Sequence, residues 1–427
     1  MVTNSFAPLV SGVARSVADY AREYRHRGHG VLVVAPEFDN QSEDEAGVMR
    51  LPAIQHFNGS DFSVALPFSR LVRSEIDEFR PQIVHSHHPF LLGATAVRIA
   101  HHFDCPLVFT HHTMYEQYTH YVPGDSPPLK RFVIDLATHY ANLCDQVIAP
   151  SESIAAILHR RGVHTPVDVV PTGIRVRDFA DGDGAQFRKA YAIPEDAPVF
   201  GHVGRLAPEK NLGFLSRAVA LVLANHPDAH FLVVGSGPSR VELERLFSER
   251  GLSGRVHATG TLEGRKLADA YHAMDAFVFA SSSETQGLVL VEAMAARLPV
   301  IAIDGTGVRE TVVDQYNGRL VPDDVSEQDF ADAMKWLLAQ PPAERNRLSN
   351  GAFETADRLS IERSAARCLE LYHRLLDRDG SDRNAEAYRL WAATRRRVAT
   401  EWALLRSLSE SMQSALQSRQ FTHDDEP

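Results

Sequence analysis

One stretch, ETQGLVLVEAM at residues 284–294, joins a short apolar run to an apolar helical segment. The run before it, at residues 276–280, predicts a buried strand, and the residues from Leu288 onward predict a helix that begins directly after Gly287. The first backbone N–H groups of a helix have no partner within the helix, and the helix dipole makes this end positive. The stretch therefore predicts a strand, a turn and a helix whose start can hold a phosphate.

Two carboxylates, Glu284 and Glu292, lie eight positions apart on either side of this helix start. Glu292 is the more informative because it interrupts an apolar run, where a buried and unpaired carboxylate would cost several kcal/mol. It therefore needs hydrogen-bond donors. Ribose hydroxyls would serve, and a neighbouring arginine or backbone N–H groups are the alternative.

On both sides of this stretch, runs rich in Val, Ile, Leu and Phe alternate with longer segments of helical period, which is typical of parallel strands joined by crossover helices. The fold class is therefore α/β. The predicted strands lie at residues 31–35, 82–85, 107–110, 146–149 and 167–170 in the first half, and at 199–203, 231–234, 256–257, 276–280 and 300–303 in the second. Only Val2, Thr3 and Asn4 precede the first turn, so we expect either an unusually short first strand or a true start of the chain that lies upstream of Met1.

A polar stretch rich in Gly and Asp, residues 171–184, predicts a linker between two doubly wound domains. Ligands of open α/β sheets bind at the carboxyl ends of the strands. We therefore expect the active site in the cleft between the domains, where these strand ends face each other. After residue 325 the pattern is helical only.

The composition excludes several classes of protein. The 427 residues carry 44 Lys and Arg against 55 Asp and Glu, a net charge of −11, so no nucleic-acid partner is expected. Three distant cysteines, Cys105, Cys144 and Cys368, provide neither a disulfide framework nor a thiolate zinc site. No basic region with an apolar run follows Met1, and nowhere do about 18 uncharged apolar residues follow one another. We expect a cytoplasmic protein without a signal peptide or membrane-spanning segment.

The pattern of Glu, seven residues and Glu at positions 284 and 292 resembles the signature of the family 4 retaining glycosyltransferases. Further segments match the same family in the same order, at residues 6–13, 27–29, 204–211, 235–237 and 305–310. The resemblance implies the GT-B fold, in which two doubly wound Rossmann-like domains face each other across a cleft. It also implies a nucleotide sugar as donor substrate.

The same resemblance implies a division of the chain. Residues 1–175 would form an N-terminal Rossmann-like acceptor domain, and residues 186–360 a C-terminal Rossmann-like donor domain. A closing helix would follow at residues 361–380. Residues 381–427 lie beyond the resemblance and are predicted to be a helical tail.

The tail is predicted to form one amphipathic helix at residues 384–419. Its apolar stripe recurs every seven residues, at Trp391, Val398, Leu405 and Met412. We expect this stripe to pack on the parent domains or to form a homodimer with a second copy. Because arginines gather near its start, peripheral contact with a membrane is the alternative.

Two cations, Arg205 and Lys210, follow the predicted strand at 199–203, at the sheet edge where ligands bind. Together they can neutralise a diphosphate without a metal ion. The resemblance implies that Glu284 approaches the sugar hydroxyls and that Gly12 lets the backbone of the other domain approach the diphosphate. The residues expected to bind the donor are Gly12, Gly204, Arg205, Lys210, Glu284, Gly287, Leu288, Val289 and Glu292.

Histidines gather between residues 85 and 112, at His85, His87, His88, His101, His102, His111 and His112. A zinc site would need three or four converging ligands, which positions on strand ends and at a helix terminus do not provide, so we expect no metal. His112 matches the family histidine that contacts the transferred sugar. The resemblance thus implies four catalytic residues, His112, Arg205, Lys210 and Glu284. A purely structural histidine is the alternative for His112 and the favoured interpretation of His101 and His102.

Residues 109–116, which continue to Tyr118 and Tyr121, and residues 285–287 are similar to the diacylglycerol glucosyltransferase branch of the family. This implies transfer of glucose from UDP-glucose to a lipid hydroxyl, with retention, at the inner face of the membrane. The residues expected to bind the acceptor are His87, His112, Tyr115 and Tyr118. No cofactor is expected, because the nucleotide sugar is a substrate.

Three alternatives stay open. The acceptor could be a soluble sugar or metabolite instead of a lipid. The same fold could house a nucleotide-sugar epimerase or hydrolase, although residues 113–128, rich in Tyr and His, provide a distinct loop for an acceptor. A noncatalytic sugar-binding protein would leave the four charged residues Arg205, Lys210, Glu284 and Glu292 without a function.

Overall fold

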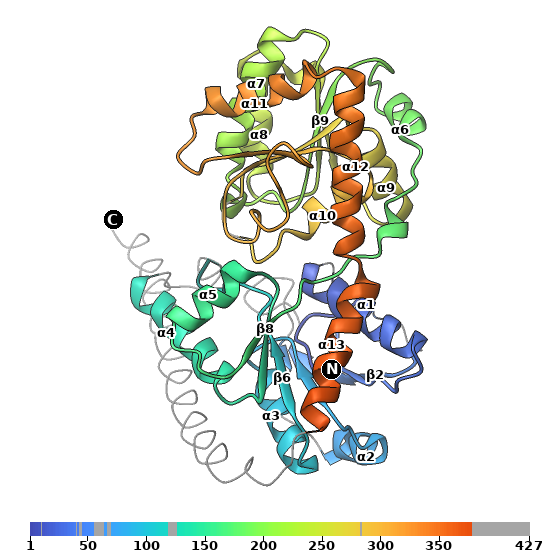
Figure 1. The fold of residues 1–427 in the computed structure, drawn as a ribbon, viewed down its shortest axis with the longest axis vertical. Helices are drawn as coiled ribbons and strands as arrows, with labels where there is room; N and C mark the ends of the chain where they lie inside the picture. The colour runs from blue at the N-terminus through green and yellow to red at the C-terminus, as the bar shows by residue number, and fades with distance from the viewer. Residues whose placement is uncertain are drawn as a thin grey trace, which may run out of the picture.

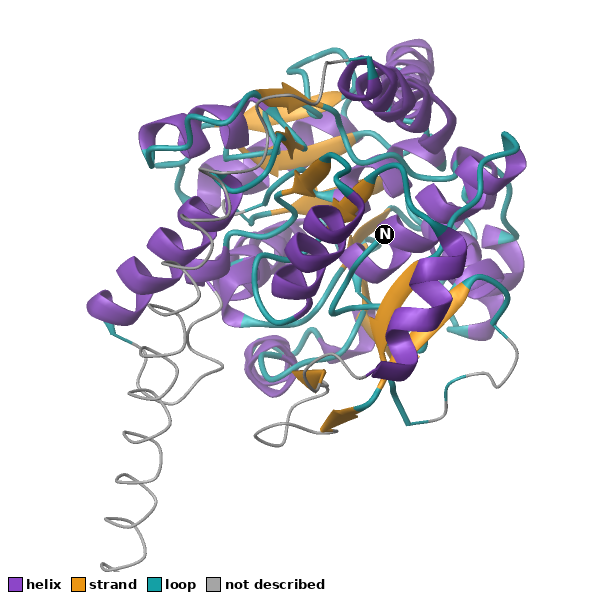
Figure 2. Cartoon of the chain, turned by 90° about the horizontal axis from the view of Figure 1, so that it is seen from below, coloured by secondary structure: helices purple, strands orange, loops and turns teal. Residues whose placement is uncertain are grey.

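The computed structural model describes residues 1–9, 11–39, 41, 45–54, 64–65, 70–117, 126–281 and 284–377. Within this part, two domains lie one above the other along the longest axis of the molecule (Figure 1). In each domain, helices flank parallel strands, and the view from below in Figure 2 shows helices on both sides of the strands. The tail at residues 381–427, with its predicted helix, and Tyr118 lie outside the described residues.

The C-terminal domain is built on a six-stranded parallel sheet with the strand order β11-β10-β9-β12-β13-β14. Its central strands are buried on both faces, which explains why they are continuous apolar runs in the sequence. The strands are β9 (Val199–Val203), β10 (His230–Val234), β11 (Val256–Gly260), β12 (Ala276–Phe279), β13 (Val300–Ile303) and β14 (Gly318–Val321). The helices are α6 (Gly184–Ala190), α7 (Leu212–Asn225), α8 (Arg240–Glu249), α9 (Gly264–His272), α10 (Leu288–Ala295), α11 (Glu327–Leu338) and α12 (Pro342–Arg358).

The N-terminal domain combines the four-stranded parallel sheet β5-β6-β7-β8 with the parallel pair β1-β2. Val2 joins the two, because it bridges Val34 of β1 and Ser86 of β5. The strands are β1 (Val33–Pro36), β2 (Val48–Leu51), β3 (Ala53–Ile54), β4 (Val64–Ala65), β5 (Val84–Ser86), β6 (Leu107–Thr110), β7 (Gln146–Ala149) and β8 (Val167–Val169). The helices are α1 (Gly12–His26), α2 (Arg70–Phe79), α3 (Leu92–Phe103), α4 (Pro127–Ala141) and α5 (Glu152–Arg160).

The chain passes between the domains twice, and the two passages run side by side. Ile174 and Ser360 form a parallel bridge, and the Ile361 N–H donates to the Ile174 carbonyl at 2.8 Å. A Cβ on Gly173 would lie 2.6 Å from the Ile361 nitrogen, so only glycine allows this approach. After the second passage, α13 (Ile361–Leu376) packs against α1 of the N-terminal domain (Figure 1).

Four predicted strands, at 107–110, 146–149, 199–203 and 300–303, agree with the structure residue for residue, and the other six differ at their ends by one to three residues. The prediction missed β2, β14 and the two-residue strands β3 and β4. β2 and β14 lie at a sheet edge and contain half-buried residues, so a continuous apolar run does not identify them. Within the described residues, no helix is long and apolar enough to cross a membrane.

Candidate active site

The first turns of two helices from opposite domains face each other. α10 begins after Gly287, whose φ of 74° lies in the left-handed region that favours glycine. α1 begins at Gly12, and Ser11 Oγ caps it by accepting a hydrogen bond from the Ala14 N–H. Leu288 Cδ1 would lie 3.7 Å from a Cβ on Gly12, so a side chain here would occupy the gap between the helices. Figure 1 shows α1 at the top of the lower domain and α10 at the bottom of the upper one.

An ion pair joins Lys210 to Glu284 at the carboxyl edge of the C-terminal sheet. Lys210 ends the 3-10 turn that follows β9, and Glu284 follows β12. Lys210 Nζ lies 2.5 Å from Glu284 Oε1, and the two side chains are only 16% and 15% exposed. Burial raises the pKa of Glu284, but the charge and hydrogen bond of Lys210 outweigh it, so the pKa is lower than usual. Glu284 is thus an ionised hydrogen-bond acceptor at neutral pH.

Gly204 and Arg205 lie on the same edge, directly after β9. The Gly204 N–H donates to the Val234 carbonyl at 3.0 Å, which holds the ends of β9 and β10 together. Arg205 Nη2 lies 2.5 Å from Glu209 Oε1, and the arginine side chain is 42% exposed. The structure therefore brings Gly204, Arg205, Lys210 and Glu284 to one edge of the sheet.

Glu292 is buried on α10 and has two partners. Arg15 Nη1 donates to its Oε1, and Tyr271 Oη donates to its Oε2 at 2.9 Å. Burial raises the pKa of Glu292, and the charge of Arg15 opposes this shift. The partner is thus an arginine, as in the alternative that the sequence left open, but it comes from α1 of the opposite domain. Binding of ribose by Glu292 stays a prediction.

The loop between β12 and α10 ties the domains together. Gln286 makes two hydrogen bonds to the backbone of Thr172, because its Oε1 accepts from the N–H at 2.5 Å and its Nε2 donates to the carbonyl at 2.9 Å. Thr285 Oγ1 donates to the His112 carbonyl at 2.8 Å, and Ser151 Oγ donates to the Thr285 carbonyl at 2.9 Å. These contacts place His112 beside the loop that carries Glu284.

His87 and His112 form a hydrogen-bonded pair of imidazoles. Their Nδ1 and Nε2 atoms are 2.9 Å apart, and the rings are stacked. Burial, with repulsion from His88 and His111, lowers the pKa of His112 to about 3, and burial also lowers the pKa of His87 well below its usual value. Both rings are therefore neutral at physiological pH. His85, by contrast, is held by Thr110 Oγ1 and the Tyr372 hydroxyl, each at 2.6 Å.

Tyr115 packs its ring edge-on against Phe90 and His111. Among the described residues, the buried Tyr115 hydroxyl and both ring nitrogens of His111 have no hydrogen-bond partner. Of the residues expected to bind the acceptor, the structure thus joins His87 to His112 and leaves Tyr115 without a hydrogen bond to either. His101 and His102 lie in the last turn of α3, away from this pair.

The sequence prediction missed Arg15, Tyr271 and Gln286 as residues of this region. A signal for Arg15 was present, because it lies three positions after Gly12 and so shares its face of the helix. Gln286 lies inside the quoted motif, but its partner Thr172 is distant in sequence. Nothing local to Tyr271 indicates that its hydroxyl meets Glu292.

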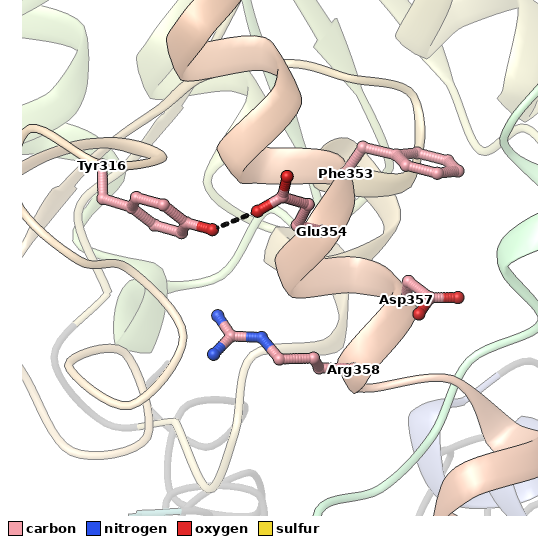
Figure 3. A pocket seen from close by; sticks show the side chains of 5 residues that line it. All are labelled: Tyr316, Phe353, Glu354, Asp357 and Arg358. Atoms are coloured by element: carbon pink, nitrogen blue, oxygen red, sulfur yellow. Dashed lines mark hydrogen bonds between the residues drawn. The ribbon is translucent and has the colours of Figure 1, made fainter.

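Within the described ranges, no group of three or more His, Cys, Asp or Glu side chains is arranged to hold a metal ion. A cavity of about 490 Å³ lies elsewhere, beside α12 (Figure 3). Tyr316, Phe353, Glu354, Asp357 and Arg358 line it, and the Tyr316 hydroxyl donates to Glu354 Oε2 at 2.5 Å. Because no predicted substrate-binding residue lines this cavity, it is not the candidate active site.

Comparison with known proteins identifies relatives of both halves of the chain. The family model described as "Glycosyl transferases group 1" matches residues 183–355, and the one described as "Glycosyltransferase Family 4" matches residues 10–178. Alpha-monoglucosyldiacylglycerol synthase of Acholeplasma laidlawii is 28% identical over 400 residues, or 90% of this chain and 98% of that protein. GDP-mannose-dependent alpha-mannosyltransferase of Mycobacterium tuberculosis is 30% identical over 349 residues, or 79% of this chain and 87% of that protein.

Solved structures show the same fold. The crystal structure of Anabaena Alr3699/HepE in complex with UDP has a TM-score of 0.68 at 20% identity and covers 88% of this chain and 99% of its own. Sucrose-phosphate synthase from Thermosynechococcus elongatus has a TM-score of 0.69 at 22% identity, and the match covers 88% of this chain and 98% of that chain. The expected GT-B fold is thereby confirmed. The chain belongs to glycosyltransferase family 4 and is a glycosyltransferase.

Proposed function

We propose that this enzyme is a retaining α-glycosyltransferase that moves glucose from UDP-glucose to a hydroxyl of diacylglycerol or a related lipid. The observation that carries the donor proposal is the pairing of Lys210 with Glu284 beside the facing first turns of α1 and α10. A cation and helix starts suit a diphosphate, and an ionised carboxylate suits sugar hydroxyls. The lipid acceptor is supported by the similarity to the alpha-monoglucosyldiacylglycerol synthases.

In the proposed reaction the acceptor hydroxyl attacks the anomeric carbon on the face from which the diphosphate departs. The bond from the anomeric carbon to the diphosphate oxygen breaks, and a diphosphate oxygen takes the proton of the hydroxyl. No side chain has to act as a base. Lys210, Arg205 and the N–H groups of Gly287, Leu288 and Val289 stabilise the negative charge that develops on the leaving group, so no metal ion is needed.

His112 contacts the transferred sugar in this proposal. A pKa of about 3 keeps its ring neutral, so it can exchange a hydrogen bond with a sugar hydroxyl without carrying charge. Its pairing with His87 and the Thr285 hydrogen bond to its carbonyl hold the ring at the domain boundary. His87 and Tyr115, with Tyr118, remain the proposed acceptor-binding residues.

A panel of UDP-glucose, UDP-galactose and GDP-mannose, offered with lipid extract or with soluble extract, tests the proposal by mass spectrometry of the products. We expect a glucosylated lipid from UDP-glucose, in the α configuration and also in the presence of EDTA. GDP-mannose is the second candidate donor because the chain is similar to GDP-mannose-dependent mannosyltransferases. Transfer from GDP-mannose would show that the proposed donor, UDP-glucose, is wrong. If products form only with the soluble extract, the acceptor is a soluble molecule and the proposed lipid acceptor is wrong.

A lipid acceptor would require contact with the inner face of the membrane, and we propose that the tail at residues 381–427 contributes to it or to a homodimer. Deleting residues 384–427 and measuring liposome co-sedimentation and oligomer mass separates the two roles. We expect one of these properties to be lost. A truncated protein with unchanged mass, stability and lipid binding would contradict both.

A further inference from the structure

A third cation, Arg15, lies at the candidate donor site. It projects from the first turns of α1 in the N-terminal domain and donates through Nη1 to Glu292 on α10 of the other domain. The arginine side chain is 36% exposed, whereas that of Glu292 is 4% exposed. A guanidinium has five N–H donors, and within the described part of the chain the Arg15 guanidinium makes no other hydrogen bond. Its Cζ lies 6.0 Å from the centre of the Phe179 ring, and the charge of Asp19 and the hydroxyl of Tyr271 also act on the guanidinium.

The pair Arg15–Glu292 repeats the arrangement of the pair Lys210–Glu284. Each of the two motif glutamates holds one cation, and Arg205 is likewise held by Glu209. The three cations and three carboxylates cancel in charge. A diphosphate can gain from these cations only if they turn toward it, and the carboxylates then need other hydrogen-bond donors. The hydroxyls of the sugar and of the ribose are donors of this kind.

We propose that Arg15 binds the diphosphate of the donor, while Glu292 exchanges the guanidinium for ribose hydroxyls. This inference rests on the proposed function. The planar guanidinium suits a phosphate because it can donate two parallel N–H bonds. Since Lys210 and Arg205 come from the C-terminal domain and Arg15 from the N-terminal domain, the diphosphate is held from both sides and its binding is coupled to closure of the cleft.

Calorimetric titration of the wild-type full chain with UDP and with GDP gives the reference affinities. The nucleotide that binds the wild type is then titrated into each variant. Arg15→Gln keeps a hydrogen-bond donor for Glu292 without the charge, and Arg15→Lys keeps the charge without the planar fork. Arg22→Ala is the matched control, because Arg22 lies on the same helix, is 55% exposed and pairs with Asp19 at 3.5 Å. The corresponding nucleoside, followed by ligand-observed NMR, lacks the phosphates that Arg15 would contact.

We expect the affinity of Arg15→Gln for the nucleoside diphosphate to be at least tenfold lower than that of the wild type. Its affinity for the nucleoside should stay within twofold of the wild-type value. Arg15→Lys should fall between, and Arg22→Ala should equal the wild type. Diphosphate binding by Arg15→Gln within twofold of the wild type would overturn the inference. An equal loss for nucleoside and diphosphate would overturn it too, because Arg15 would then only hold Glu292 in place. A wild type that binds neither UDP nor GDP would instead remove the proposed donor class.

Discussion

The chemistry of the site depends on how individual carboxylates are partnered. Glu284 has a lysine, and Glu292 has an arginine and a tyrosine hydroxyl. Both carboxylates are largely buried, so a ligand that removes a partner has to supply a donor in its place. A nucleotide sugar carries hydroxyls on both the sugar and the ribose, and this is why two glutamates eight positions apart suit such a donor.

Lys210→Ala should weaken transition-state stabilisation, measured through kcat/KM for the donor, by about 2–4 kcal/mol. The change removes a charge-assisted contact and leaves Glu284 without its cation. The measurement is the initial rate at subsaturating donor. Lys266→Ala, an exposed lysine on α9, is the control and should leave the rate unchanged. A Lys210→Ala rate within threefold of wild type would contradict the proposed role of the lysine.

Two adjacent strands concentrate histidines at one edge of the N-terminal sheet. β5 and β6 run parallel, with His85 opposite Val108, so the residues after both strands emerge side by side. This arrangement delivers His87 and His88 from one strand end and His111 and His112 from the other. Burial lowers the pKa of every one of these four rings, to about 4 for His88 and about 3 for His111.

The N-terminal domain should therefore lose stability in acid. Below about pH 6.5 the unfolded chain protonates these histidines while the folded chain does not, so the unfolded state binds more protons and stability falls toward about pH 4. The loss is at most about 1.4 kcal/mol per pH unit for each histidine. Urea unfolding across this range, followed by circular dichroism, measures the slope.

His111→Phe tests the origin of this slope. Among the described residues His111 has no hydrogen bond to lose, so the variant removes a titrating group and keeps an aromatic ring against Phe109 and Tyr115. The unfolding free energy of the variant should depend less steeply on pH, by the contribution of one bound proton. A slope equal to that of the wild type would show that His111 does not stay neutral in the folded protein.

The relation between the domains is decided at the scale of the whole molecule. The Gln286 side chain and the Thr172 backbone meet across the boundary, and Arg15 meets Glu292 beside them. α13 ends the described chain by packing back on the N-terminal domain, so the C-terminal domain lies between two passages of chain. The interdomain contacts therefore hold the two domains in the arrangement seen in Figure 1.

Gln286→Ala should shift the molecule toward a more open form. The change leaves the buried N–H and carbonyl of Thr172 without their partner, at a cost of roughly 1–3 kcal/mol to the observed domain arrangement. We expect a larger radius of gyration in small-angle X-ray scattering and a higher KM for the donor. Gln328→Ala on the exposed face of α11 is the control. An unchanged radius of gyration and KM would mean that other contacts hold the domains in this arrangement.

The α/β class, ten of the strands and the motif that marks the family follow from the amino-acid sequence alone. These features are local, because strands buried on both faces must be apolar runs and a helix start needs a suitable turn residue such as Gly287. The same reasoning predicted that Arg205 and Lys210 lie at the carboxyl edge of the sheet, since ligands of open α/β sheets bind there.

Which side chains contact one another depends on how the two domains fold and pack. Arg15 and Glu292 are 277 positions apart, and Gln286 and Thr172 are 114 positions apart, so no periodicity in the chain connects them. The edge strands β2 and β14 escaped prediction because a sheet edge tolerates half-buried residues. The sequence thus determined that Glu292 needs a partner, since a buried carboxylate cannot stay unpaired, and the packing of the two domains decided that the partner is Arg15.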